Sequence, residues 1–210
     1  QHSPHKWASP EYGSRQQYEQ HDNTPALDLK DTKFVQEVLG TLLYYGRAVD
    51  CTMITAIGSI ATHQASATQA TLESITQLLD YCATYPDAII RFRASDMILY
   101  VESDASYLCE SKARSRAAGY HYLSTKRANP ANPPSADDPQ PPLNGPSNVV
   151  SKVLREVLSS AAEAELAGLF LNGKEAVTEG ITLEELGHLQ PPTPIVTDNS
   201  TASGIANDSM

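Results

Sequence analysis

The chain has 210 residues, of which 40% are hydrophobic and 19% are charged. This length allows one domain or two small ones, and the apolar share is sufficient for a packed core. The formal net charge of −10 disfavours nucleic-acid binding through clustered Lys and Arg, unless acidic side chains hold metal ions that reverse the local charge. No apolar stretch reaches the about 18 residues of a membrane-spanning helix and no signal peptide is recognised, so neither membrane insertion nor secretion is predicted.

The first 90 residues are predicted to form a tail followed by helices. Residues 1–28 are rich in Gln, His, Pro and Tyr and have no periodicity, which is typical of an extended tail. From Asp31 onward apolar residues recur every three or four positions, which indicates an amphipathic helix that Asp28 or Asp31 could cap. Runs at 53–61 and 72–82 have the same period. We therefore expect residues 29–90 to be a helical segment.

From about residue 88 the pattern changes to short strands that alternate with helices. Apolar runs predict strands at 88–93, 97–101, 119–123, 149–154 and 194–197. Helices are expected from Ser159 or Ser160 to about Val177, at 181–186 and at 201–207. Half of the prolines lie in 129–146, which indicates a loop. The order of elements predicts an α/β domain over residues 91–210, with a mixed sheet and flanking helices.

The basic residues are concentrated in one part of the chain, shortly after Asp104. They are Lys112, Arg114, Arg116, Lys126 and Arg127. Runs of charge usually lie in solvated loops, which is the plainer interpretation of this group. The alternative is a contact to the phosphates of a substrate.

Three short acidic segments give the strongest indication of chemistry. Asp104 and Asp198 each follow a predicted strand, whereas Glu163 and Glu165 lie near the start of an alanine-rich helix. Carboxylates from two strands and a helix can converge on Mg²⁺, a hard cation that prefers oxygen, and bound Mg²⁺ supports phosphodiester hydrolysis. Each acid taken alone has a simpler explanation as a turn residue, a helix cap or a solvated side chain. Their order along the chain favours a metal site.

Only one of the two glutamates can belong to such a site. Residues two positions apart on a helix point about 200° away from each other. An apolar stripe predicts the buried face of the helix, and the glutamates lie on its opposite flanks; the stripe consists of Ala162, Leu166, Leu169, Phe170 and Gly173. Periodicity therefore leaves both Glu163 and Glu165 open.

The acidic segments and their neighbours resemble a known family, the ribonuclease H region of copia-type LTR retrotransposon polyproteins. Asp104-Ala105-Ser106-Tyr107 resembles the family's Asp-Ala-Asp-Trp, and Ser159-Ser160-Ala161-Ala162-Glu163-Ala164-Glu165-Leu166 resembles its Ser-Ser-Thr-Glu-Ala-Glu-Tyr. Thr197-Asp198-Asn199-Ser200-Thr201-Ala202 resembles Cys-Asp-Asn-Gln-Ser-Ala, and Arg114-Ser115-Arg116-Ala117-Ala118-Gly119-Tyr120 resembles Arg-Lys-Ser-Thr-Ser-Gly-Tyr. Residues 35–45 are similar to the segment that connects the reverse transcriptase to this nuclease, so the resemblance covers about residues 30–207.

The resemblance implies an RNase H-like fold that hydrolyses the RNA strand of an RNA–DNA hybrid with Mg²⁺ or Mn²⁺. It implies that Asp104, Glu165 and Asp198 are catalytic metal ligands. Glu165 is preferred to Glu163 because the family places an apolar residue directly after this glutamate and a small residue three positions after it. The implied partners are the hybrid and the rest of the polyprotein, and the implied location is intracellular, in the cytoplasm or the nucleus.

Two hypotheses of different kinds follow. The family has a fourth acidic residue on a C-terminal helix, which the sequence up to Met210 does not match. The chain is therefore either a metal-dependent ribonuclease H or a catalytically inert, retroelement-derived fragment that acts as a scaffold or interaction domain. Convergence of the Asp104, Glu165 and Asp198 carboxylates would favour the metal site, whereas Asp198 directed into a helix N-terminus would favour a cap.

Overall fold

The computed structural model describes residues 2–6, 22–127 and 139–208, which fold as two compact units. One unit comprises residues 1–90, 108–114 and 151–153, and the other comprises 91–107, 115–150 and 154–210. Much of the predicted tail, at residue 1 and residues 7–21, lies outside the described residues. So does the 129–138 part of the predicted proline-rich loop, whereas residues 139–144 form a segment without helix or strand.

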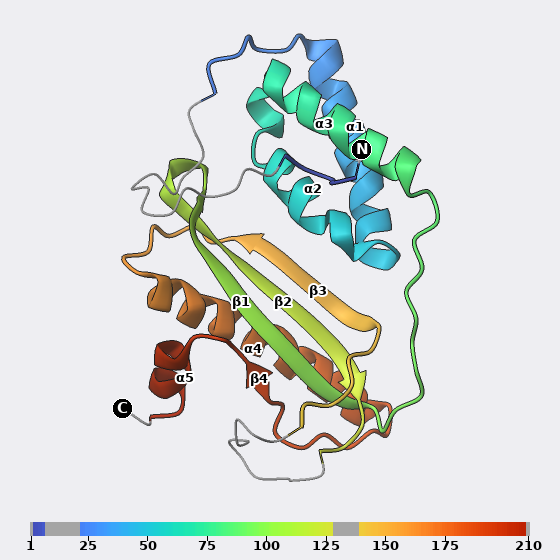
Figure 1. The fold of residues 1–210 in the computed structure, drawn as a ribbon, viewed down its shortest axis with the longest axis vertical. Coiled ribbons are helices and arrows are strands. Elements are labelled where there is room, and N and C mark those ends of the chain that lie inside the picture. The colour runs from blue at the N-terminus through green and yellow to red at the C-terminus, as the bar shows by residue number, and fades with distance from the viewer. Residues whose placement is uncertain (1, 7–21, 128–138, 209–210) are drawn as a thin grey trace. The chain divides into compact units, whose positions relative to one another are not determined.

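The first unit is built from three helices, α1 (Leu29–Ala48), α2 (Ile54–Ala61) and α3 (Gln69–Thr84), with single 3₁₀ turns at Cys51–Met53 and Gln64–Ser66 (Figure 1). Asp28 caps α1, since its carboxylate accepts the Asp31 N–H at 2.7 Å. The apolar periodicity that predicted these helices supplies their core, which includes Val35, Leu39, Met53, Ala56, Ile57, Ile60, Ile75 and Leu78. The helices are therefore as predicted, and most of their apolar positions are buried, whereas Phe34 and Leu43 of the periodic run are 43% and 41% exposed.

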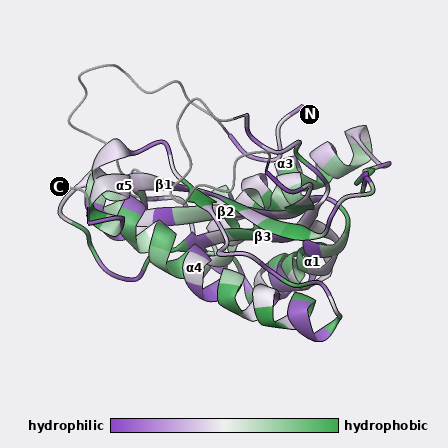
Figure 2. Ribbon diagram, turned by 90° about the horizontal axis from the view of Figure 1, so that it is seen from below, coloured by the Kyte–Doolittle hydropathy of each residue, from purple (hydrophilic) through white to green (hydrophobic). Residues whose placement is uncertain are grey.

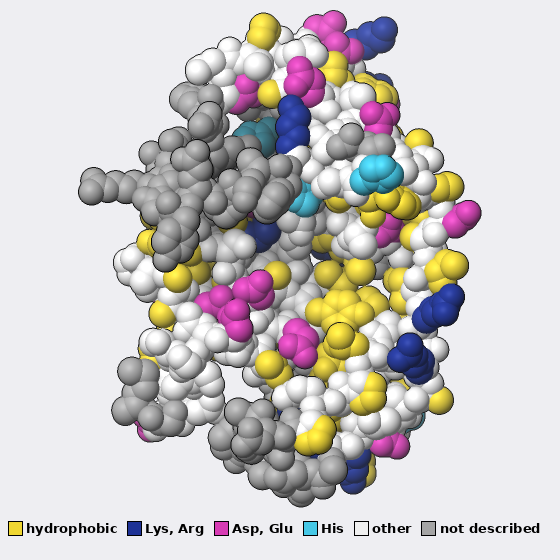
Figure 3. Space-filling model, in the orientation of Figure 1, with side chains coloured by type: hydrophobic (Ala, Val, Ile, Leu, Met, Phe, Trp, Pro, Cys, Tyr) yellow, Lys and Arg dark blue, Asp and Glu magenta, His cyan; other side chains and the backbone are white. Residues whose placement is uncertain are grey.

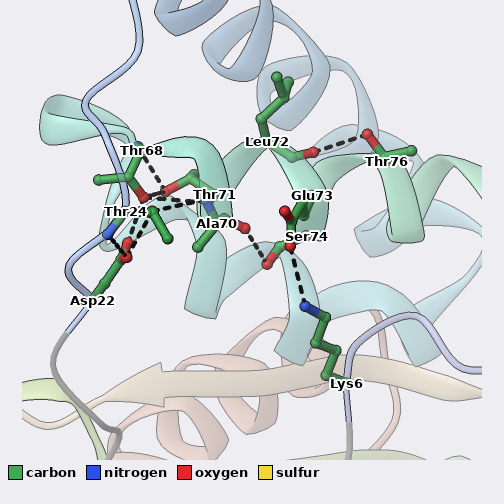
Figure 4. A network of polar contacts seen from close by, with 10 residues as sticks. All are labelled: Lys6, Asp22, Thr24, Thr68, Ala70, Thr71, Leu72, Glu73, Ser74 and Thr76. Carbon is green, nitrogen blue, oxygen red and sulfur yellow. Dashed lines mark hydrogen bonds and ion pairs between the residues drawn. The ribbon is translucent and has the colours of Figure 1, made fainter.

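A network of polar contacts surrounds the N-terminus of α3 (Figure 4). Thr68 caps the helix, because its hydroxyl accepts the Thr71 N–H while the Thr71 hydroxyl accepts the Thr68 N–H at 3.1 Å. The Thr68 hydroxyl donates to Asp22, which also accepts from the N–H and hydroxyl of Thr24. These hydrogen bonds, that of Thr68 foremost, lower the pKa of Asp22 to about 2. They tie the segment before α1 to α3.

The second unit contains most of a four-stranded mixed sheet in the order β3-β2-β1-β4, with helices beside it (Figure 1). The strands are β1 (Ile98–Glu110), β2 (Arg114–Ser124), β3 (Pro146–Val153) and β4 (Ile195–Val196), and the helices are α4 (Ala161–Glu185) and α5 (Ser200–Ala206). β4 pairs with β1 in parallel. Leu99 and Val101 of β1 pack against Ala176 and Leu183 of α4. The predicted class, a mixed α/β sheet with flanking helices, is confirmed at this level. Within the described segments, no helix has both the length and the apolar character needed to cross a membrane.

Three predicted elements differ from the structure. Residues 88–93 form no strand, and Ile89 and Phe92 are 72% and 68% exposed. The backbone of Arg93 is bonded by the Asn144 side chain, which accepts its N–H and donates to its carbonyl, in place of a strand ladder. β1 continues to Glu110, so Asp104 lies within a strand and not after one. The two helices predicted at 159–177 and 181–186 are a single helix, since α4 runs through Gly180 at a propensity cost of about 1 kcal/mol.

The predicted basic loop is also different. Arg114 and Arg116 lie within β2, and Arg116 is only 5% exposed. Lys112 lies in the short 3₁₀ turn between β1 and β2, and Lys126 is exposed just after β2. The basic residues are thus divided between a strand and its two ends, because a hairpin runs through the segment. They do not form one solvated loop.

The buried face of α4 is not the apolar stripe that the sequence predicts. Its buried residues are Ala164, Glu165, Gly168, Asn172, Ala176 and Leu183, whereas Phe170 is 72% exposed. Figure 2 shows hydrophobic residues distributed along α4 and not confined to one side. A Cβ at Gly168 would lie 3.4 Å from the Asp104 carbonyl oxygen, so the helix approaches β1 closely. At Gly168 only a small residue allows this approach, and the buried face also holds two polar side chains, Glu165 and Asn172.

Candidate metal centre

The two aspartates lie at the same offset from the paired residues of neighbouring parallel strands, Asp104 within β1 and Asp198 just after β4. Val101 pairs with Ile195 and Glu102 with Val196, and Asp104 and Asp198 each follow two residues after the second pair. Parallel strands run in the same direction, so both aspartates lie toward the same end of the β1–β4 pair. The register of a two-residue strand therefore brings together two acids that are distant in the sequence.

The two glutamates of α4 have different roles. Ser160 caps the helix by accepting the Glu163 N–H at 3.1 Å. The Glu163 carboxylate accepts the hydroxyl and N–H of Ser159 at 2.6 and 2.7 Å, and these hydrogen bonds lower its pKa. Glu163 is exposed and occupied at the helix start, whereas Glu165 lies on the buried face and is 5% exposed. Of the pair, Glu165 is the one directed at the sheet.

Asp104, Glu165 and Asp198 form a carboxylate cluster. Each offers a ligand oxygen, and these three atoms all lie within 4.8 Å of one another. Glu165 is buried while both aspartates are exposed, so the cluster is closed on one side and open to solvent on the other. Figure 3 shows acidic side chains gathered at the surface over the region of β1 and α4. The three acids thus converge and could hold a metal ion.

Hydrogen bonds to Glu165 come from β1 and from the residue that follows β4. One carboxylate oxygen accepts the Ala105 N–H of β1 at 3.1 Å, and that N–H also reaches Asp104 Oδ1 at 2.7 Å. The other oxygen accepts the Thr197 hydroxyl, just after β4, at 3.2 Å. β4 pairs with β1 only at Val101 and Glu102. Glu165 therefore accepts the Ala105 N–H of β1 beyond the point where β4 stops pairing with this strand.

The electrostatics of the cluster favour a cation. Burial raises the pKa of Glu165, and the charges of Asp104 and Asp198 raise it further, against the opposing effect of the hydrogen bonds from Ala105 and Thr197. Three carboxylates at this distance repel one another, and a divalent cation between them would remove the repulsion. The donors are all carboxylate oxygens, which suit the hard ions Mg²⁺ and Mn²⁺ better than softer metals. The residues present therefore fit such an ion.

Asp198 does not cap the helix that follows it. Asn199 caps α5, because its side-chain oxygen accepts the Ala202 N–H at 2.9 Å, and the Asn199 N–H donates to the Thr197 hydroxyl at 3.3 Å. The local hydrogen bonds on either side of Asp198 are therefore made by Thr197 and Asn199. The capping interpretation of Asp198 is wrong for this structure.

The contribution of Thr197 to the site was not predicted. A β-branched residue at the end of an apolar run is typical of a strand, which hides the role of its hydroxyl. The only signal was its place beside Asp198 in the Thr-Asp-Asn-Ser segment. The role of the Ala105 N–H could not be predicted from the sequence, since almost every residue type carries the same backbone donor.

Comparison with known proteins assigns no family to this geometry. The chain matches no protein-family model, no curated protein sequence and no solved structure. Its function is therefore inferred from the carboxylate cluster, the sheet that holds it and the sequence motifs.

Proposed function

We propose that this chain is the ribonuclease H of a copia-type LTR retrotransposon and hydrolyses the RNA strand of RNA–DNA hybrids with Mg²⁺ or Mn²⁺. The observation that carries the proposal is the convergence of Asp104, Glu165 and Asp198 within 4.8 Å. The motifs select the same three residues from separate segments of the chain. An RNase H-like fold is part of the proposal, and the mixed sheet with flanking helices is compatible with it.

Asp104, Glu165 and Asp198 would hold the cation. When bound, Mg²⁺ supplies Lewis-acid catalysis of phosphodiester hydrolysis. Glu165 is fixed by the Ala105 N–H and the Thr197 hydroxyl, so its carboxylate is oriented before substrate arrives. Asp104 and Asp198 are exposed on the open side, from which a nucleic-acid strand can approach. A cation there also offsets part of the negative charge that would repel a phosphate backbone.

On the same proposal, the chain belongs to a retroelement polyprotein and works inside the cell, in the cytoplasm or the nucleus. Its partners are then the RNA–DNA hybrid and the other segments of that polyprotein. The support for this part is the motif resemblance over residues 30–207, including the helical segment that resembles a reverse transcriptase connection.

The test is hydrolysis of labelled RNA, annealed to DNA or left single-stranded, by the purified full chain in Mg²⁺. We expect cleavage of the hybrid alone, and Asp104→Asn should reduce it to background because one ligand is lost. Glu163→Gln is the matched control: it removes one acid from the same region, outside the cluster, and should retain cleavage. A chain that binds no divalent cation in calorimetry would contradict the proposal. Mg²⁺ binding without cleavage would support the inert interaction domain.

A further inference from the structure

A buried polar network crosses the second unit beneath the carboxylate cluster, and Asn172 of α4 is at its centre. Its side-chain nitrogen donates to Ser103 Oγ at 2.9 Å and to the Ala118 carbonyl at 2.8 Å. Its side-chain oxygen lies 3.2 Å from His121 Nε2. Asn172 and His121 are both 0% exposed. One amide therefore connects α4 to β1 and β2 at once.

The His121–Glu179 pair extends this network to β3. His121 Nδ1 lies 2.8 Å from Glu179 Oε1. The Glu179 carboxylate also accepts the Ser147 hydroxyl at 2.9 Å and the Asn148 amide at 3.1 Å. The Ala118 carbonyl can only accept, so the amide nitrogen of Asn172 faces it and the amide oxygen faces His121. Protonated His121 donates from both ring nitrogens, from Nδ1 to Glu179 and from Nε2 to the Asn172 oxygen. This fixes which end of the amide faces Ser103.

The backbone around this network has no spare room. A Cβ on Gly119 would lie 1.9 Å from the Asn172 side-chain oxygen. A Cβ on Gly168 would lie 3.4 Å from the Asp104 carbonyl oxygen and 3.5 Å from Ser103 Oγ. At Gly168, about one helical turn after Glu165, α4 thus contacts β1 at both Ser103 and Asp104.

We propose that Asn172 is a positioning residue for the carboxylate cluster: by holding Ser103 against α4 it sets the separation between Asp104 and Glu165, and the His121–Glu179 pair fixes the orientation of its amide. The inference rests on the proposed metal-dependent function and deepens it. A leucine at position 172 has the same branched arrangement of four side-chain heavy atoms, with bulkier methyl groups, and leaves Ser103, the Ala118 carbonyl and His121 without this partner. Buried polar groups that lose their partners favour a rearranged backbone.

The test compares Asn172→Leu and the milder Ser103→Ala with the unmutated full chain. Two quantities are measured: hydrogen exchange of the Ala105 amide by NMR and Mg²⁺ affinity by calorimetry. In Asn172→Leu we expect Ala105 to exchange at least about tenfold faster, because its hydrogen bond to Glu165 is loosened. We also expect about 10–100-fold weaker Mg²⁺ binding, as is usual when the support of a metal ligand is removed. Ser103→Ala should change both quantities in the same direction by less.

Leu183→Ala is the matched control. It lies on the same buried face of α4, several turns from the cluster, and its loss weakens the core formed with Leu99 and Val101. It should lower overall stability yet leave the Ala105 exchange, relative to other β1 amides, and the Mg²⁺ affinity unchanged. A merely structural role for Asn172 would make the Asn172→Leu chain behave like this control.

The outcomes separate the two proposals. Unchanged Ala105 exchange in both Asn172→Leu and Ser103→Ala would overturn the positioning role. If Asn172→Leu fails to fold, Ser103→Ala decides by the same measurements. If the unmutated chain binds no Mg²⁺, the proposed function fails, while the Ala105 exchange still decides whether Asn172 positions the cluster.

Discussion

Removing one charge from the carboxylate cluster should make the metal-free protein more stable. Two unit charges 4.8 Å apart repel by about 1 kcal/mol in the dielectric of water and by about 3.5 kcal/mol at an effective dielectric of 20. Asp198 is exposed, so the lower figure applies to each of its two neighbours. We expect Asp198→Asn, which is nearly isosteric, to raise the free energy of unfolding without metal by about 1–2 kcal/mol.

Mg²⁺ should reverse this order. At a concentration ten times its Kd, a ligand that binds only the folded state stabilises it by about 1.4 kcal/mol, and at a hundred times Kd by about 2.7 kcal/mol. The unmutated chain should gain this stability, whereas Asp198→Asn, with one ligand fewer, should gain much less. The assay is urea unfolding of both proteins in EDTA and in increasing Mg²⁺. The difference in EDTA should shrink at 1 M salt, where the screening length falls to about 3 Å.

Glu156→Gln is the control, since it removes an exposed acid of the same unit that lies outside the cluster. It should leave both the stability in EDTA and the response to Mg²⁺ close to those of the unmutated chain. The reasoning is refuted if Asp198→Asn destabilises the protein in EDTA, or if Mg²⁺ stabilises both proteins equally. Either result would mean that the three carboxylates do not share a charge-dependent site.

Two further predictions concern the packing beneath the site. Burial lowers the pKa of His121, but Glu179, Asn172 and Glu175 together outweigh burial, so this pKa is raised. Burial raises the pKa of Glu179, but its hydrogen bonds outweigh burial, so this pKa is lowered. Their contribution to stability should be full between the ordinary pKa values of 4.5 and 6.5 and be lost as pH rises through the raised pKa of His121. The difference in urea stability between the unmutated chain and Glu179→Gln should therefore be larger at pH 5.5 than at pH 8.5, and a pH-independent difference would contradict the pairing. Gly119→Ala should destabilise the protein by about 1–3 kcal/mol in thermal unfolding, because the added Cβ meets the Asn172 amide. Gly40 is exposed in α1 with nothing within 4 Å of an added Cβ, so Gly40→Ala should stabilise the protein by up to about 1 kcal/mol in the same assay.

The helices of the first unit were predictable because apolar residues at helical spacing supply their core. Val35, Leu39, Ile75 and Leu78 recur at helical spacing and are all in the core. The strand expected at 88–93 failed for the opposite reason. A strand depends on a partner elsewhere in the chain, and alternation within the segment carries no information about that partner.

The candidate site was predictable only in part. The residue types of Asp104 and Asp198 indicated oxygen ligands, but their proximity depends on the β1–β4 register, which is a tertiary property. The choice of Glu165 came from the motif resemblance and not from helix angles. The angles were measured from an apolar stripe that included the exposed Phe170, whereas the buried face combines small residues with the polar Glu165 and Asn172.

The shortness of β4 makes the integrity of the cluster depend on the C-terminal segment. Two residues pair with β1, yet the segment that follows carries both Asp198 and the hydroxyl that holds Glu165. Such a short strand can detach at a smaller free-energy cost than unfolding of the sheet, and without metal the repulsion among the acids favours detachment. A bound cation would join this segment to β1 and α4. Resistance of the C-terminal segment to proteases should therefore rise with the Mg²⁺ concentration.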